Sequence, residues 1–273
     1  GAGRRRLTSE NPNLVGCSLS SFGLAEEHAR EVGHDLNFAA LAGLLTLLPQ
    51  EGLPRLQLAD VTAGLLACNA ILAALFRRAR GGGGGWIDQP IASGPMPLLT
   101  WAFADVAGGG GGLVDALLGG ACPAYRLYRC GDGKRIAVGA LEPKFWKTFV
   151  DVLGLPDLSG AGLDPGPRGE ETARKVQETL VTRPRAEWLA LLAEYHLPVT
   201  AVHGLEDAFA DPTLQAMKWF EETPVPGGGR RTMTAAFLHS IGASPGRPAP
   251  RLGEHSQSLA REFDLDGPDL PLP

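Results

Sequence analysis

The first third of the chain alternates short apolar runs with longer apolar stretches. The run from Leu14 to Leu19 predicts a buried strand, and the run from Trp86 to Asp88 predicts a second one. Two helices are expected between these strands, one from about Asn37 to Leu48 and one from Asp60 to about Arg80. Asp35 and Asp60 are favourable N-cap residues for the two helices. This part of the chain therefore predicts the order strand, helix, helix, strand.

A different pattern begins at Tyr125. The runs Tyr125 to Cys130 and Arg135 to Gly139, separated by the turn Gly131-Asp132-Gly133, predict a β-hairpin. The other expected elements are helices over 97–106, 143–153, 170–182 and 184–195, a strand over 197–202, a Pro- and Gly-rich linker over 224–250 and a last helix over 256–263. Helices and strands mixed along the chain in this way indicate the α/β class.

Composition restricts the possible partners. The 273 residues are 44% hydrophobic, which is enough for a core in one or two domains, and the net charge is -5 without a basic stripe, which argues against nucleic acid. The four cysteines form no C-x-x-C, so we expect free thiols in a reducing compartment. The longest apolar run, Leu65 to Phe76, is shorter than the roughly 20 residues that span a bilayer. We therefore expect a cytoplasmic protein with no membrane partner.

Three residues suited to acid-base chemistry stand where helices are expected to begin: His34, Asp60 and Glu142. Each has a structural alternative, as a loop histidine, an N-cap and a first-turn carboxylate. Two bases at two helix N-termini suit a reaction that removes a proton from one face of a carbon and returns it to the other. The remaining histidines lack metal spacing, so no metal site is expected. The glycine runs at 81–85 and 108–112 lack the Lys-Ser/Thr of a phosphate loop and predict connectors.

The order of several short motifs resembles the family III CoA-transferases, also called CaiB/BaiF proteins. The resemblance is strongest to their α-methylacyl-CoA racemase branch and extends from about Asn11 to Phe263. Its most specific parts are Gly33-His34-Asp35 and Ala140 to Trp146. The other segments that carry it are Asn11 to Val15, Ser18 to Gly23, Ala59-Asp60, the hairpin segment and Pro248 to His255.

The resemblance to the racemase branch implies that His34, Asp60 and Glu142 serve the active site. It also implies that the pantetheine arm of CoA lies near four neighbouring residues, Gly33, Asp35, Asn37 and Phe38. The implied reaction inverts the α carbon of a 2-methylacyl-CoA thioester through an enolate, with backbone N–H groups after His34 stabilising the enolate oxygen. CoA is then part of the substrate, and no separate cofactor is expected.

Two alternatives remain open. In the transferase branch, the aspartate that matches Asp60 is the nucleophile, and a glycine loop lies near the position of Gly119-Gly120. That branch usually has an aromatic residue where His34 stands, so His34 and Glu142 together favour the racemase. The third possibility is a truncated homologue that dimerises without catalysis, because members of the family begin with a Rossmann-like segment that this sequence lacks.

The resemblance also implies the architecture. We expect a truncated Rossmann-like large lobe with a connector over 1–122, a smaller α+β lobe over 123–223, and a linker with a C-terminal return to the large lobe over 224–273. An interlocked homodimer is implied, in which Glu142 of one subunit reaches His34 of the other. One departure concerns the orientation of Asp60: many racemases have Asn four residues before the catalytic Asp, whereas this chain has Leu56, with Gln57 beside it.

Overall fold

The computed structural model describes residues 3–25, 27–48, 53–110, 112, 114–225, 229–234 and 250–263. The chain divides into two compact units, Gly1–Val199 and Thr200–Pro273, and each is described by itself. The first unit contains two separate apolar cores, one around helix α2 and one around a three-stranded sheet. The predicted boundary between residues 122 and 123 stays a prediction.

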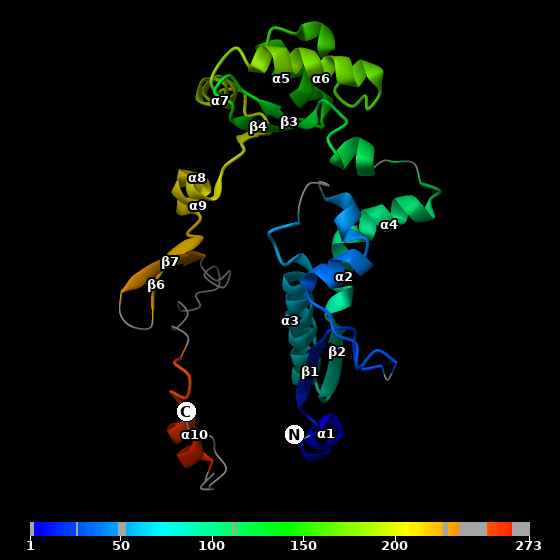
Figure 1. Cartoon of the computed structure of the whole chain (residues 1–273), viewed down its shortest axis with the longest axis vertical. Helices are drawn as coiled ribbons and strands as arrows, with labels where there is room; N and C mark the ends of the chain where they lie inside the picture. The colour runs from blue at the N-terminus through cyan, green and yellow to red at the C-terminus, as the bar shows by residue number, and fades with distance from the viewer. Residues whose placement is uncertain are drawn as a thin grey trace. The chain divides into compact units, whose positions relative to one another are not determined.

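The first core belongs to a parallel strand-helix-strand unit (Figure 1). Strand β1 (Val15–Ser20) pairs in parallel with β2 (Gly85–Pro90), and helix α3 (Leu58–Ala79) packs against both strands and against α2 (Asp35–Leu41). This confirms the order predicted from the apolar runs. Because α3 runs between the end of β1 and the start of β2, its N-terminus lies toward the carboxyl ends of the strands, where open α/β sheets place ligands.

Helix α2 differs from its prediction at both ends. Its N-cap is His34 rather than Asp35, which lies in the first turn. The helix ends at Leu41 instead of Leu48, because Gly43 adopts a left-handed conformation with φ 83° and a short 3-10 helix, η1 (Leu44–Leu47), follows. The remaining elements of this part are α1 (Arg4–Glu10), η2 (Ile91–Ser93), η3 (Met96–Leu99), α4 (Thr100–Ala107) and the π-helix η4 (Val114–Leu118).

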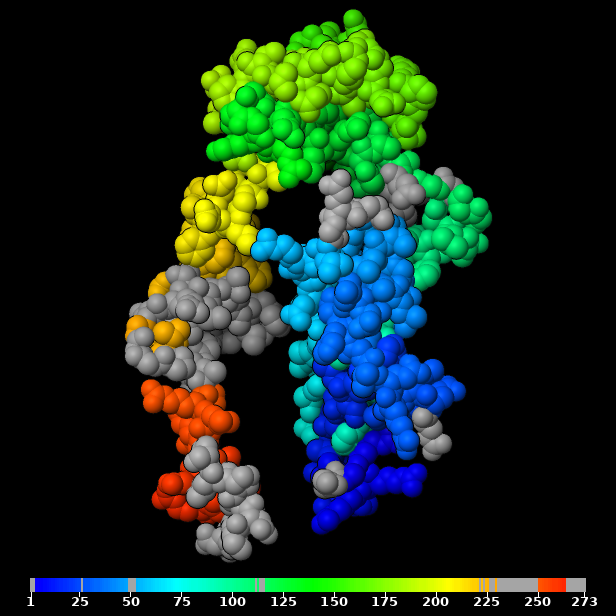
Figure 2. Space-filling model, viewed as in Figure 1, coloured from blue at the N-terminus to red at the C-terminus, as the bar shows by residue number. Residues whose placement is uncertain are grey.

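The second core lies beneath a sheet of order β3-β4-β5. Strands β3 (Tyr125–Arg129) and β4 (Arg135–Gly139) form the predicted antiparallel hairpin, and the third strand is β5 (Val199–Ala201). The accompanying helices are α5 (Pro143–Val152), η5 (Pro156–Leu158), α6 (Pro167–Leu180) and α7 (Arg185–Ala193). The part of the chain that contains this core is the green to yellow-green mass in the space-filling view (Figure 2).

Large side chains fill this second core, and their polar ends are hydrogen-bonded. Tyr128, Trp146 and Trp188 are each at most 3% exposed. Their polar atoms donate to backbone carbonyl oxygens: the Tyr128 hydroxyl to Pro123, the Trp146 indole to Leu158 and the Trp188 indole to Leu180, at 2.8–3.0 Å. Burial raises the pKa of the Tyr128 hydroxyl further above its ordinary value, so it remains a donor.

The unit from Thr200 onwards contains α8 (Leu205–Ala210), α9 (Pro212–Ala216), β6 (Phe220–Pro224), β7 (Arg230–Thr234) and α10 (Ser256–Glu262). Helix α10 confirms the last predicted helix. The linker prediction is wrong over β7, because residues 230–234 pair with β6. The rest of the expected linker and tail lies partly outside the described residues, at 226–228, 235–249 and 264–273.

The apolar helix α3 is longer than the apolar run expected from the sequence. It has 22 residues, and among the described residues it is the one helix long and apolar enough to cross a membrane by length and composition, although core helices of soluble proteins pass the same test. Before Leu65 the helix continues back to Leu58, with Asp60 as its one charged residue before Arg77. Only 17% of its most apolar window is buried. Its exposed apolar residues Val61, Leu65, Leu72 and Phe76 follow one another at spacings of four and seven, so they form one stripe. We call these four residues the α3 stripe.

The first turn of α3 is packed tightly against the chain after β2. A Cβ on Gly94 would lie 2.3 Å from the Ala59 carbonyl oxygen, whereas a Cβ on Gly64 would meet nothing within 4 Å. We predict that Gly94→Ala lowers the free energy of unfolding by about 1–3 kcal/mol through this clash. Gly64→Ala, the control, should raise it by about 0.4–1 kcal/mol. Urea unfolding measures both, and equal stability of the two variants would contradict the packing described here.

Candidate active site

His34 and Asp60 stand at the starts of two adjacent helices. His34 is the N-cap of α2, and its backbone N–H donates to the Asn37 side-chain oxygen at 3.1 Å. Asp60 lies in the first turn of α3. The His34 side chain is exposed and Asp60 is half-buried. Both are therefore open to a substrate, and their separation depends on what holds the two helix starts together.

A single carboxylate joins the two helix starts. Asp35 Oδ1 accepts hydrogen bonds from the backbone N–H of Ala59 at 2.7 Å and from that of Asp60 at 3.0 Å. Because Asp35 follows His34 directly, the bond to the Asp60 N–H brings the two candidate bases into one neighbourhood. That their side chains face each other across one substrate carbon stays a prediction.

The Asp60 carboxylate has a second polar neighbour on its own helix start. The Gln57 side-chain amide donates to Asp60 Oδ2 at 3.3 Å. The sequence shows an amide three residues before Asp60 but gives no sign that it reaches the carboxylate. This contact orients Asp60. Gln57 lies one residue after the position at which many members of the racemase branch have Asn.

The other residues expected near CoA lie in the same turn. Phe38 is 1% exposed, and its ring packs edge-to-face on Phe22 with the ring centroids 5.3 Å apart. A Cβ on Gly33 would lie 2.8 Å from that Phe38 ring, so only glycine fits before His34 without a shift. The Asn37 side-chain oxygen accepts a hydrogen bond from the His34 N–H. Contact of Gly33, Asp35, Asn37 and Phe38 with CoA stays a prediction.

Glu142 belongs to the part of the chain that contains the hairpin. It is the exposed N-cap of α5, and its backbone oxygen accepts from the N–H groups of Phe145 and Trp146 at 2.9 and 3.1 Å. Within the described ranges, no hydrogen bond or ion pair joins it to His34 or Asp60. The structure thus brings together two of the three predicted catalytic residues, and the role of Glu142 stays a prediction.

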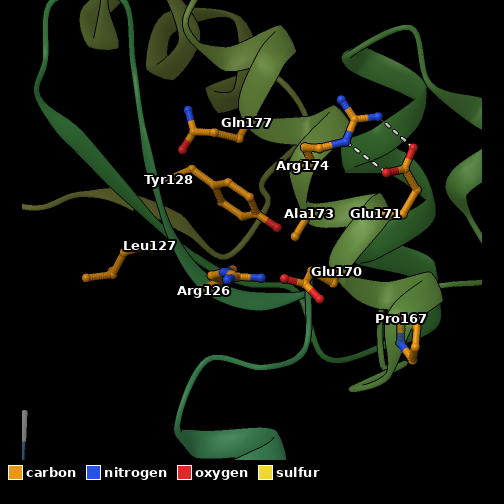
Figure 3. A pocket seen from close by; sticks show the side chains of 9 residues that line it. All are labelled: Arg126, Leu127, Tyr128, Pro167, Glu170, Glu171, Ala173, Arg174 and Gln177. Carbon is orange, nitrogen blue, oxygen red and sulfur yellow. Dashed lines mark hydrogen bonds and ion pairs between the residues drawn. The ribbon is translucent and has the colours of Figure 1, made fainter.

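A groove of about 540 Å³ lies between β3 and α6 (Figure 3). Its charged wall is partly neutralised, because Arg174 makes ion pairs with Glu171 and Glu178. Arg126 and Glu170 point toward one another in Figure 3, and none of the predicted site residues lines this groove. The sequence did not reveal it, since its walls come from segments about 45 residues apart.

A second cavity of about 490 Å³ contains the glycine pair associated with the transferase branch. It is lined by Leu118, Gly119, Gly120, Tyr125, Arg126, Leu127, Ala137 and Val138. Elsewhere in the part of the chain that the structure describes, no group of three or more His, Cys, Asp or Glu side chains is placed to hold a metal ion.

A family model identifies the family of this chain. The model for CoA-transferase family III matches residues 1–256. The chain belongs to CoA-transferase family III. This confirms the resemblance inferred from the motifs around His34, Asp60 and Glu142.

Both branches of the family are found among the relatives of this member. The α-methylacyl-CoA racemases of Homo sapiens and Mus musculus are 30% and 29% identical to it; the matches cover 97% and 98% of this chain and 71% and 72% of those proteins. The succinyl-CoA:glutarate CoA-transferase of Mus musculus is 23% identical, over 96% of this chain and 63% of that protein.

Solved structures support the family fold. A CaiB/BaiF family protein from Brucella suis superposes with a TM-score of 0.73 at 24% identity, over 96% of this chain and 71% of that one. A hypothetical protein from Mycobacterium tuberculosis superposes with a TM-score of 0.77 at 24% identity, over 94% of this chain and 71% of that one. The expected α/β fold of the CoA-transferase family III is therefore confirmed.

The charge balance of the β3–α6 groove can be tested by titration. The hydrogen bond from Arg174 lowers the pKa of Glu171 from 4.5 to about 2. We predict that Arg174→Gln returns this pKa toward 4.5, whereas Lys175→Gln changes it less, because Lys175 lies 3.5 Å from the carboxylate. Carboxyl chemical shifts in NMR measure both variants.

The ion pair between Arg174 and Glu171 makes the stability of the fold depend on pH. Since folding lowers the pKa of Glu171, the pair stabilises the fold above pH 4.5, and this contribution disappears as the pH falls toward about 2. A Glu171 pKa that stays near 2 in Arg174→Gln would contradict the assignment of Arg174 as the main cause.

Proposed function

We propose that this family member inverts the α carbon of a 2-methylacyl-CoA thioester by proton transfer between two bases. The observation that carries the proposal is the hydrogen bond that the Asp60 N–H donates to the Asp35 carboxylate, which holds the starts of α2 and α3 together. The 30% identity to the human racemase and the histidine at position 34 support the same reaction.

The proposed reaction uses only groups of these two helix starts. One base, His34 or Asp60 according to the hand of the substrate, takes the α proton as the electrons move into the thioester carbonyl to form an enolate. The other base then delivers a proton to the opposite face of the same carbon. In the described residues the backbone N–H groups of Asp35 and Leu36 have no hydrogen-bond partner, so they are available to the enolate oxygen.

A second candidate function is CoA transfer with Asp60 as the nucleophile. The Asp60 carboxylate would attack the thioester carbonyl, forming an acyl anhydride and releasing CoA as thiolate. The thiolate would then attack the Asp60 carbonyl, giving an aspartyl-CoA thioester and the free acid. The cavity at Gly119-Gly120 and the similarity to succinyl-CoA:glutarate CoA-transferases favour this alternative.

Proton exchange separates the two functions. We predict that the protein incorporates deuterium at the α carbon of 2-methylacyl-CoA in deuterated water, followed by NMR, together with inversion on a chiral column. His34→Ala and Asp60→Ala should each abolish inversion, while one-sided exchange survives through the remaining base. His28→Ala and Asp132→Asn, exposed residues in loops, serve as controls and should keep full activity.

A transferase would give different results in the same variants. Asp60→Ala would then abolish activity, His34→Ala would be tolerated, and hydroxylamine would trap an adduct on Asp60. That pattern would overturn the racemase proposal. Absence of both exchange and adduct in the wild type would favour the non-catalytic homologue.

We also propose that the protein acts as a homodimer and that Glu142 reaches the His34 site from the other subunit. The α3 stripe supports this, because four large apolar side chains on one helix face are each at least 55% exposed.

The dimer is tested on α3 itself. Leu65→Glu combined with Leu72→Glu should convert the dimer to monomer in sedimentation velocity, since two charges would lie in the buried interface. Ala73→Glu, an exposed position on another face of α3, is the control and should leave the dimer intact. A wild-type monomer at every concentration would contradict the proposal.

A further inference from the structure

Helix α3 receives its N-terminal cap from another helix. The first N–H groups of a helix have no partner within it, and the N-cap side chain usually satisfies one or two of them. In α3 the N-cap is Gln57, whose side chain makes no such bond and instead contacts Asp60. The N–H groups of Ala59 and Asp60 donate to Asp35, which lies 24 and 25 residues earlier in the chain.

The first turn of α3 is thereby fixed on two sides. The Asp35 carboxylate accepts from the N–H groups of this turn, and the backbone at Gly94 packs closely against the Ala59 carbonyl oxygen. Ala59 itself is fully buried. A bond from an ionised carboxylate to a backbone N–H is among the stronger hydrogen bonds, and negative charge is favoured at a helix N-terminus. The position of Asp60 therefore depends on Asp35.

We propose that Asp35 is a positioning residue, which sets the placement of Asp60 relative to His34 by capping α3 from the turn that carries His34. This inference rests on the proposed function. On this proposal, the Asp35 side chain binds α3 rather than CoA. The Asp35 backbone N–H stays available for the enolate oxygen. Asp35 takes no proton from the substrate; it acts through the two bases.

The test compares Asp35→Ala, Asp35→Asn and a matched cap variant. Asp211 makes the same pair of bonds to its own helix: it is the N-cap of α9, and one of its carboxylate oxygens accepts from the N–H groups of Thr213 at 2.8 Å and Leu214 at 3.1 Å. Asp211→Ala thus removes a carboxylate that accepts from two N–H groups, together with its contact to His203, in the unit that begins at Thr200. Kinetics of α-proton exchange are measured on the full chain, with rates referred to the folded fraction from circular dichroism.

Positioning predicts a fall in kcat without a matching change in KM. Asp35→Ala should lower kcat by about 100-fold, the size of effect expected when a reacting group moves by roughly 1 Å, and should change KM by less than about threefold. Asp35→Asn keeps an acceptor oxygen in the same place and should retain kcat within about tenfold. Asp211→Ala should keep kcat unchanged.

Two results would overturn the inference. An unchanged kcat in Asp35→Ala, with only a loss of folded protein like that of Asp211→Ala, would make Asp35 a structural cap. A raised KM with unchanged kcat would make it a CoA-binding residue.

A readout that needs no activity separates this inference from the proposed function. Amide hydrogen exchange by NMR should show the N–H groups of Ala59 and Asp60 protected in the wild type and in Asp35→Asn. In Asp35→Ala both N–H groups should exchange faster. If the wild type proves to be a transferase, the same split between kcat and KM is measured on adduct formation at Asp60. Unchanged protection of both amides in Asp35→Ala would overturn the inference whichever reaction the protein performs.

Discussion

The arrangement of the candidate site depends on one interaction, the pair of hydrogen bonds that Asp35 accepts from the Ala59 and Asp60 N–H groups. Residues 34 and 60 belong to different helices, and a helix start is held only by what caps it and packs on it. By capping α3 from the first turn of α2, one carboxylate links the position of a histidine to that of an aspartate. Any chemistry that needs both groups at one carbon requires such a link.

Close backbone packing supports the same link. Gly94 lies so near the Ala59 carbonyl oxygen that a side chain would displace the first turn of α3, and Gly33 occupies the space beside the buried Phe38 ring. Neither glycine needs a left-handed conformation, so both are required for space. These two close contacts fix the turn that carries His34 and the first turn of α3, while the His34 side chain itself is exposed.

Much of this fold follows from local patterns in the sequence. The apolar runs predicted β1, α3 and β2, and two short runs on either side of a Gly-Asp-Gly turn predicted the β3–β4 hairpin. Helix α2 is shorter than predicted because Gly43 adopts a left-handed conformation, and β7 lies in a Pro- and Gly-rich stretch that was predicted to be a linker. The family motifs indicated His34 and Asp60. The function of the Asp35 side chain was missed, since a good N-cap residue can cap another helix and only tertiary contact decides which.

We propose that His34 and Asp60 stand on opposite sides of one substrate carbon. A crystal structure with an unreactive thioether analogue of a 2-methylacyl-CoA is the sharpest test of this arrangement. We expect the α carbon between His34 and Asp60, with both side chains within proton-transfer reach and the Asp35 carboxylate on the Ala59 and Asp60 N–H groups. An analogue whose carbonyl position lies over Asp60, with His34 turned away from the α carbon, would contradict it.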